Sequence, residues 1–408
     1  MRARVVRAIL VAALWLPAGV AAQTVSITES EALARLSADS PRVRAIRSAI
    51  DLARAEVLNA SRWPNPRINV DREAVSGVSE TMVTVLQPLP VTGRRTLDRD
   101  SASALVNAAT NRADEAVRRT RADLRLAYLD LVTAQARERE LARSRNRLQE
   151  LASILEKREA AGDAAGFDRL RSEREVIEVE ADRQAAAGDR ARAQATLAGF
   201  FPTGTDPSTL VAVEPVVPVR DLPPVDLLVE EAVRIRGDIL ALRQDIESAR
   251  LALRAADRRR IPEPELLAGT KSSTAAGGDV GSVISVQAVL PLFDRGRPER
   301  AMAQARAAQA QARLDALAVT LRADIGAWRA AALDRRNGAE RYRAAALPTA
   351  SEVERIAQVS YDAGDRSILE LLDAYRTSAS ARVRQAALDA AARQAEIELE
   401  YASGWEIP

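Results

Sequence analysis

Apolar residues recur at helical spacing along most of the chain, and only a few short stretches alternate as strands do. Two of the helical sets are Leu124, Tyr128, Leu131 and Val132, and Leu314, Leu317, Leu321 and Ile325. The longest uninterrupted helical runs are predicted at 96–160 and 297–362. A helix of 65 residues would extend about 100 Å. No globular core is that long, so the pattern predicts long antiparallel coiled-coil hairpins, in which abundant alanine lets the helices approach closely.

Four short segments are predicted as strands, at about 67–75, 80–88, 264–272 and 282–290. In the last of them Ile284 and Val286 alternate with Ser285 and Gln287. Strands of about this length, apolar on one side and polar on the other, are typical of outer-membrane barrels. Soluble hairpins show the same alternation, so the strands alone leave both possibilities open.

The chain is predicted to contain one unit twice. A Pro-x-Pro signal at 64–66 returns at 262–264, a shift of 198 residues. A second strand ends in similar sequence at 87–94 and 290–297, a shift of 203. The helical runs break at Ala-Gly-Asp, at 161–163 and 363–365, a shift of 202. Matched landmarks at nearly one shift indicate an internal duplication.

This pattern divides the chain into a first repeat at 23–200, a proline-rich connector at 201–224 and a second repeat at 225–408. Each repeat opens with a short helix, predicted at 29–38 and 226–235. Each closes with a helical hairpin, predicted at 96–199 and 297–402, whose returning helices are 164–199 and 366–402. The expected fold is mainly α-helical with a small β part, ordered helix–strand–strand–helix twice.

The N-terminus predicts a cleaved secretory signal peptide at 1–22. Arg2, Arg4 and Arg7 precede the apolar run 8–16, and small residues precede a cleavage point before Gln23. Its removal lowers the basic residues from 59 to 56 against 57 acidic ones, so the mature chain is nearly neutral and carries no nucleic-acid footprint. The chain has no cysteine, which excludes a lipidated N-terminal cysteine.

The composition also limits the chemistry. The chain has no histidine and no cysteine, which removes the usual general base, the commonest metal ligand and the familiar catalytic triads. We therefore expect no enzymatic activity, no cofactor and no tightly bound metal. Beyond the signal no apolar run approaches 18 residues, so any membrane crossing would need a closed β-barrel. Four strands cannot close one, because the smallest membrane barrels have about eight, and three copies would supply twelve.

The whole mature chain resembles the TolC-like outer-membrane efflux protein family. Segments 87–95 (QPLPVTGRR) and 290–296 (LPLFDRG) are similar to the strand-to-helix motifs of its cobalt-zinc-cadmium resistance branch. Segment 361–374 (YDAGDRSILELLDA) is similar to the tip of its inner hairpin. The resemblance implies a homotrimer with a twelve-stranded barrel in outer-membrane lipid and a helical barrel in the periplasm. It also implies a periplasmic adaptor and an inner-membrane RND-type pump as partners.

The resemblance implies roles for individual residues. Tyr361 and Arg366 match a tyrosine and an arginine that hold the entrance shut, and Asp168 matches an aspartate that pairs with that tyrosine. Glu370 and Asp373 match two rings of pore aspartates, with glutamate in place of aspartate at the first. These charges have an alternative interpretation as ordinary solvated helix surface.

The glycines of the motifs are expected to be structural. The hairpin-tip turns, which would contact the adaptor, contain Gly162, Asp163, Gly364 and Asp365. Gly93, Arg94, Gly296 and Arg297 are expected to mark the strand-to-helix transition.

The sequence is compatible with three functions. The first is a passive duct for substrate, with heavy-metal cations or drugs and peptides as alternatives. The second is a periplasmic adaptor, although adaptors carry a single hairpin with β-rich domains. The third is a structural coiled-coil protein.

Overall fold

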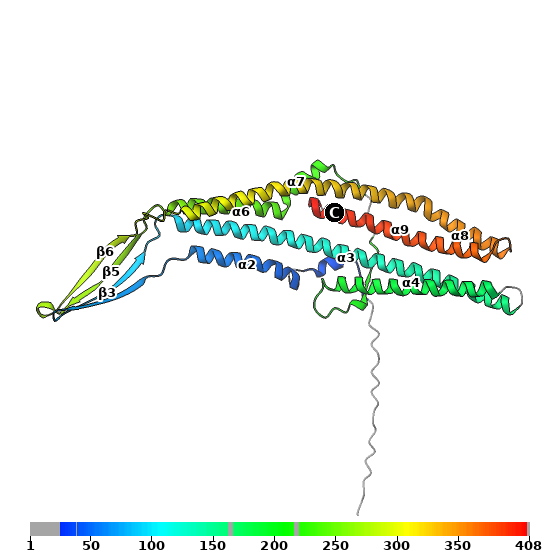
Figure 1. Cartoon of the computed structure of the whole chain (residues 1–408), viewed down its shortest axis with the longest axis horizontal. Helices are drawn as coiled ribbons and strands as arrows, with labels where there is room; N and C mark the ends of the chain where they lie inside the picture. Colours follow the sequence, from blue (N-terminus) through cyan, green and yellow to red (C-terminus); the bar gives the residue numbers. More distant parts are fainter. Residues whose placement is uncertain (1–24, 38, 162–165, 216–219, 406–408) are drawn as a thin grey trace, which may run out of the picture.

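The computed structural model describes residues 25–405 except 38, 162–165 and 216–219. It is an elongated bundle of helices with a small sheet at one end (Figure 1). The predicted signal peptide at 1–22 lies outside the described residues. None of the described helices combines the length and the apolar composition that crossing a bilayer requires.

The first half of the chain builds one long hairpin and three strands. After β1 (Val25–Ile27) come α1 (Glu29–Arg35) and α2 (Pro41–Ser61), then β2 (Arg67–Val75) and β3 (Val78–Pro88). The hairpin is α3 (Arg94–Ala160) and α4 (Gly166–Ala198). At about 1.5 Å per residue, the 67 residues of α3 extend about 100 Å.

The second half follows the same order. A short 3₁₀ turn (Pro207–Thr209) and β4 (Leu210–Ala212) lead to α5 (Val225–Ile235) and α6 (Gly237–Arg258). Strands β5 (Pro264–Ser273) and β6 (Asp279–Ala288) flank a 3₁₀ turn (Ala275–Gly277). The second hairpin consists of α7 (Arg297–Arg341), α8 (Leu347–Asp362) and α9 (Ile368–Ser403).

Most predicted element bounds agree with the observed ones to within two residues, and two differ by three. The first helix ends at Arg35 rather than at 38, after a capping box between Thr28 and Glu31 fixes its start. The fourth strand runs Asp279–Ala288 rather than 282–290, because the tight turn at Ala275–Gly277 lets pairing begin at Ser273 and Asp279. Leu290 therefore lies beyond the strand.

The predicted run 297–362 is interrupted by a π-helical turn at Tyr342–Ala346, where the amide of Leu347 donates to the carbonyl of Tyr342. Pro348 explains the interruption, because it has no N–H to donate and its ring crowds the preceding turn. The hydroxyl of Thr349 donates to the carbonyl of Ala345 at 2.7 Å and satisfies a carbonyl in the widened segment.

The helices form a single curved layer around α3. Beside the sheet, α3 lies between α2 and α6, and α7 packs on α6. At the other end α3 lies between α4 and α9, with α7 and α8 along α9. Much of the buried surface of α3 is alanine, including Ala104, Ala108 and Ala127. These small side chains permit the close approach that the composition predicts.

The two halves are joined in the middle of the bundle. β1 pairs in parallel with β4, and both pack on α3. The hydroxyl of Tyr128 donates to the carbonyls of Ile27 at 2.8 Å and Val213 at 2.5 Å. Burial raises the pKa of Tyr128 to about 12, so this hydroxyl stays a donor at physiological pH.

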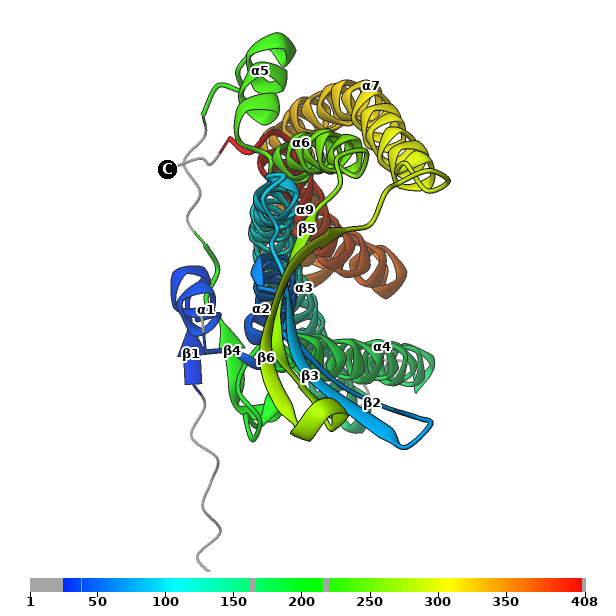
Figure 2. The ribbon, with the colours of Figure 1, turned by 90° about the vertical axis from the view of Figure 1, so that its left-hand side faces the viewer.

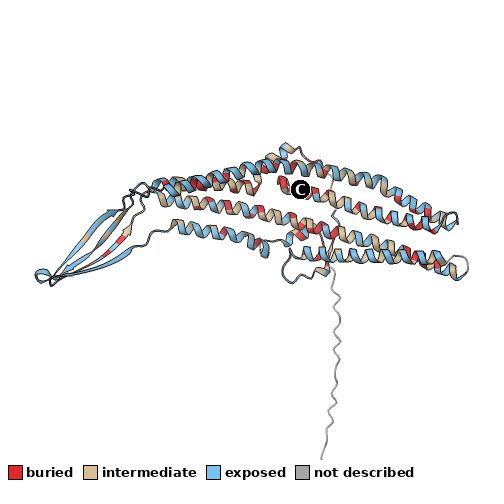
Figure 3. Ribbon diagram, viewed as in Figure 1, coloured by how far each residue is buried: buried red, intermediate tan, exposed pale blue. Residues whose placement is uncertain are grey.

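The sheet is antiparallel in the order β2-β3-β5-β6, so β2 and β6 are its unpaired edges. It is strongly curved (Figure 2) and largely exposed (Figure 3). The register places Ile68, Val85, Ala268 and Ile284 in one row across a single face. The adjacent row of that face carries Val70 and Val83.

The opposite face of the sheet is polar. Arg67 pairs with Glu265 at 2.6 Å across the intervening strand. Lys271 pairs with Glu80 at 2.6 Å. The sheet thus has one apolar face, which no other described part of the chain covers, and one polar face. This is the alternation that the sequence predicts for these strands.

Candidate functional site

The candidate site lies at the end of the bundle farthest from the sheet, where the two hairpins turn (Figure 1). The turn between α8 and α9 is closed by Gly364, whose φ of 80° favours glycine. The amide of Asp365 donates to the carbonyl of Ser360 at 2.9 Å, as in a helix C-cap. Gly162 and Asp163, predicted for the other turn, lie outside the described residues.

A shared apolar core holds the two hairpins together near their tips. It combines residues of α3, α8 and α9, and Val176 and Val179 of α4 pack against it. The core residues are Leu148, Leu151, Leu155, Ala357, Ile368, Leu371, Leu372 and Ala374. Tyr361 and Tyr375 also pack on this core. A substitution at either tyrosine would therefore alter the packing between the two hairpins.

Tyr361 lies near residues of the other hairpin. The guanidinium of Arg158, at the end of α3, lies 5.8 Å from the centre of the Tyr361 ring. Burial raises the pKa of Tyr361, Arg158 opposes this shift, and the charge of Asp168 adds to it. The structure thus places Arg158, which the sequence analysis missed, close to the Tyr361 ring. The pairing of Asp168 with Tyr361 stays a prediction.

Arg366 is placed differently. Its guanidinium lies 3.4 Å from a carboxylate oxygen of Glu370 on the same hairpin, and about half of each side chain is exposed. Such a surface pair contributes little to stability. Within the described part of the chain, Arg366 forms no hydrogen bond or ion pair with Tyr361 or Asp168.

Glu370 and Asp373 lie on one face of α9. Ile368, Leu371 and Leu372 are buried, which leaves Glu370 and Asp373 on the exposed side of the same helical turn. Their spacing of three residues makes them neighbours on the helix surface. The two carboxylates therefore form a single exposed acidic stripe near the tip.

Ionic contacts between helices stabilise the region behind the tip. Glu354 of α8 is buried and pairs with Arg147 of α3 and, at 3.1 Å, with Arg382 of α9. Arg376 of α9 pairs with Glu175 of α4 at 2.6 Å. Sequence reasoning missed these residues, because arginine and glutamate recur throughout the helices and nothing in their spacing singles them out.

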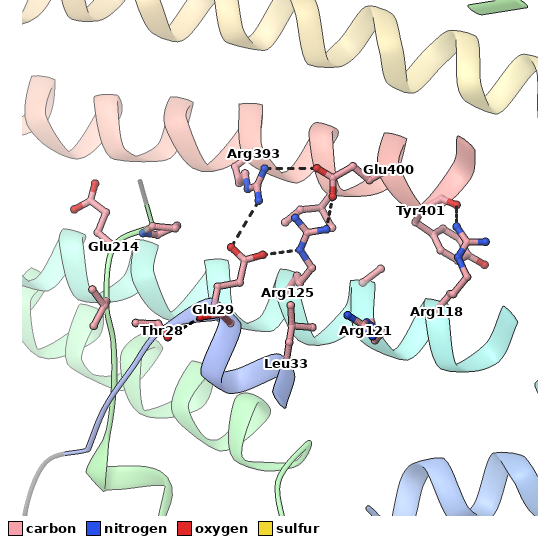
Figure 4. A pocket seen from close by; sticks show the side chains of 15 residues that line it. Thr28, Glu29, Leu33, Arg118, Arg121, Arg125, Glu214, Arg393, Glu400 and Tyr401 are labelled. Carbon is pink, nitrogen blue, oxygen red and sulfur yellow. Dashed lines mark hydrogen bonds and ion pairs between the residues drawn. The ribbon is translucent and has the colours of Figure 1, made fainter. Parts of the chain in front are cut away.

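A second ionic cluster lies halfway along the bundle (Figure 4). Arg125 of α3 pairs with Glu29 of α1 at 2.5 Å and with Glu400 of α9. Arg393 of α9 approaches Glu29 at 3.6 Å and pairs with Glu396 at 3.2 Å. The cluster borders a cavity of about 530 Å³ and links the start of the chain to its last helix.

The described residues contain no group of three or more acidic side chains placed to hold a metal ion. Neither cluster combines a nucleophile with a base. The geometry of the tip is that of a contact between two hairpins, with an exposed acidic stripe beside it.

Known proteins share this architecture. Residues 228–405 match the sequence model of the family described as Outer membrane efflux protein. The chain superposes on a membrane protein from Pseudomonas aeruginosa with a TM-score of 0.76 and 20% identity, covering 92% of this chain and 93% of that one. The second half of the chain thus matches the outer membrane efflux protein family, and the whole chain shares its fold with solved membrane proteins.

Two further known proteins are similar to this chain. The outer membrane channel CmeC of Campylobacter jejuni superposes with a TM-score of 0.76 at 14% identity, over 99% of this chain and 94% of that chain. The cobalt-zinc-cadmium resistance protein CzcC of Cupriavidus metallidurans is 23% identical over 367 residues, 88% of this chain and 85% of its own length. The predicted resemblance to TolC-like efflux proteins is confirmed.

Proposed function

We propose that this chain is the outer-membrane duct of a tripartite export system, exported by its signal peptide, in which three copies form one channel. The observation that carries the proposal is the small sheet at the end of the long hairpins. It has two unpaired edges and one uncovered apolar face. Unpaired backbone groups at a sheet edge are costly in lipid, so the edges must meet other strands.

Trimer formation follows from the number of strands. One copy offers β2 at one edge and β6 at the other, and both neighbouring pairs within the chain are antiparallel. An edge-to-edge ring of three copies gives a twelve-stranded barrel, in which the two repeats of each chain occupy similar positions. The long hairpins then continue the barrel as a tunnel through the periplasm.

The hairpin tips supply the proposed gate and docking surface. Arg158 and Tyr361 would link the hairpins near the entrance, with Asp168 as the proposed partner of Tyr361, and Arg366 would belong to the same gate through its pair with Glu370. Glu370 and Asp373 would form two rings of carboxylates around a threefold axis, which would favour cations. The turn containing Gly364 and Asp365 is the proposed contact for a periplasmic adaptor, which connects the duct to an inner-membrane pump of the RND type.

We expect Tyr361→Phe combined with Arg158→Ser to raise single-channel conductance in planar bilayers. The double variant lacks the hydroxyl of Tyr361 and the guanidinium of Arg158 above its ring, so the closed state loses contacts between the hairpins. Threefold symmetry repeats this loss in each copy. The open population rises about tenfold for every 1.4 kcal/mol removed from the closed state. Arg366→Ser alone should have a smaller effect, because its ion pair with Glu370 is exposed.

Arg171→Ser, an exposed arginine of α4, is the control and should leave conductance unchanged. In the same recordings, Glu370→Gln with Asp373→Asn should weaken cation preference without opening the channel. Wild-type conductance in the tyrosine–arginine variant would remove these residues from the gate. Unaltered selectivity in the carboxylate variant would make the stripe ordinary solvated surface.

For the substrate we propose heavy-metal cations. The support is the match to a cobalt-zinc-cadmium resistance protein over most of both chains. Export of drugs or peptides is the alternative, since a duct does not need to bind what it passes. The absence of histidine and cysteine from the chain argues against neither substrate class.

Deletion of the chromosomal gene tests the substrate. We expect the deletion strain to lose tolerance to cobalt, zinc or cadmium by severalfold in growth inhibition assays, with tolerance to hydrophobic drugs unchanged. Complementation with the intact chain should restore metal tolerance. Loss of drug tolerance alone would favour the alternative substrate class.

A further inference from the structure

A cavity of about 590 Å³ lies where β6 leads into α7, at the base of the sheet. It is lined by three arginines and three apolar residues. These are Arg260, Arg295, Arg297, Leu290, Pro291 and Leu292. Arg260 follows α6, whereas the other five come from the segment between β6 and the first residue of α7. Two distant parts of the sequence thus contribute to one basic pocket.

The three arginines have no acidic partner in the described part of the chain. Arg295 donates only to the carbonyl of Pro291, at 3.3 Å. The nearby carboxylates are engaged elsewhere: Arg259 pairs with Glu299 at 2.8 Å and approaches Asp294 at 3.8 Å. The pocket therefore carries a concentrated positive charge.

The rim of the pocket is apolar and exposed. Leu290 and Leu292 are both more than half exposed, and the adjacent Phe293 is 97% exposed. Exposed apolar residues of this size, next to unpaired arginines, fit a ligand with an anionic head and an apolar body. Free phosphate would use the arginines and leave the rim in water.

The first half of the chain provides an internal comparison. Its similar segment, 87–94, is held against the protein: Gln87 donates to the carbonyl of Pro64 at 3.0 Å and the amide of Leu89 to that of Pro264 at 2.9 Å. There Arg94 pairs with Glu263 at 3.4 Å. The second segment has leucine in place of Gln87, phenylalanine in place of Pro90, and arginines without a carboxylate.

A second copy of the chain would not supply the missing carboxylate. If β2 of a neighbour pairs with β6 as β5 pairs with β3, the residue corresponding to Glu263 is Asn65. The residues near it include Arg62 and Arg67, which are basic. Because Arg67 already pairs with Glu265 of its own chain, closing the ring adds the charge of Arg62 and no carboxylate at the position of Glu263.

We propose that the pocket of Arg260, Arg295 and Arg297 binds the phosphate of an anionic phospholipid. The acyl chains of the lipid lie along Leu290, Leu292 and Phe293. The inference rests on the proposed function, which places the base of the sheet at the periplasmic surface of the outer membrane. Clusters of basic residues at a membrane surface attract anionic headgroups, and aromatic residues favour the same interfacial depth.

The test uses the intact protein, purified in a mild detergent and titrated with phosphatidylglycerol or phosphatidylcholine while bound lipid is counted by native mass spectrometry. We expect phosphatidylglycerol to be preferred. Arg260→Gln, Arg295→Gln and Arg297→Gln together should reduce this preference about tenfold or more, since each basic residue contributes roughly fivefold. The corresponding lysine triple variant keeps the charge and should retain most of the preference.

The matched control changes three exposed arginines that form no ion pair in the described chain: Arg254→Gln, Arg306→Gln and Arg313→Gln. Equal lipid loss in this control, or unchanged binding in the pocket variant, would overturn the inference. Displacement of the lipid by millimolar inorganic phosphate would also overturn it, because the site would then bind a simple anion. Trimer content and outer-membrane fractionation are measured separately, so an intact outer-membrane trimer without lipid preference contradicts only this inference.

Discussion

Val286→Arg is expected to abolish most outer-membrane trimer. Val286 is exposed on the apolar face of β6, opposite Leu266 of β5. An arginine facing lipid costs about 2–4 kcal/mol near the bilayer midplane, and a trimer bears this cost three times. Outer-membrane fractionation, followed by gel migration without heating, measures the surviving trimer.

The neighbouring residue provides a matched control. Ser285 lies on the opposite face of the same strand, next to Val286 in sequence. Ser285→Arg should therefore assemble much as the wild type does, since its side chain would point into a polar lumen. If Val286→Arg assembled normally, or if both variants failed equally, the apolar face would not be the lipid-facing side of a barrel.

Arg125→Ala is expected to destabilise the fold by about 3–5 kcal/mol, because it leaves a buried acid with only the more distant Arg393, at 3.8 Å, as its partner. Arg125 lies between Glu29 and Glu400, and Glu400 is almost completely buried. Thermal unfolding followed by circular dichroism measures the loss. Arg54→Ala is the control, because its pair with Asp51 is largely exposed and should contribute under about 1 kcal/mol.

The deficit of Arg125→Ala should depend on pH. Burial raises the pKa of Glu400, and Arg125 opposes that shift. Without Arg125 the folded-state pKa rises further above the unfolded value. The deficit is then full above the raised pKa, and it shrinks as the pH falls through that value, because the protonated acid needs no partner. A deficit independent of pH between 7 and 4 would show that packing, and not the charge of Glu400, causes it.

The helical part of the fold could be predicted well from the sequence. A continuous 3.6-residue period and helix breaks at glycine and proline define elements such as α3 without knowledge of their neighbours. The π-helical turn could not be predicted from that period. It depends on how the chain relaxes around Pro348, and a proline near a helix start is usually accommodated without a change of helix type.

The candidate site was predictable only in part. Tyr361 packs on a core that both hairpins share, as expected for a residue that ties the hairpins together, whereas its pairing with Asp168 stays a prediction. Arg158 was missed, since it is one of many arginines on a charged helix and only tertiary packing sets it apart. The ion pair between Arg366 and Glu370 was also not predicted, although their spacing of four residues permits it. The orientation of Glu370 and Asp373 toward a pore stays a prediction.

The π-helical turn at Tyr342–Ala346 also bears on how the chain can tolerate changes in length. A π turn holds one residue more than an α turn, so deletion of Ala345 can close it while α7 and α8 keep their packing faces. α3 contains no extra residue of this kind. A one-residue deletion within α3 would rotate the rest of that helix by about 100° relative to its packing partners. The second hairpin can therefore lose a residue at this point during evolution, whereas the first would need a compensating insertion.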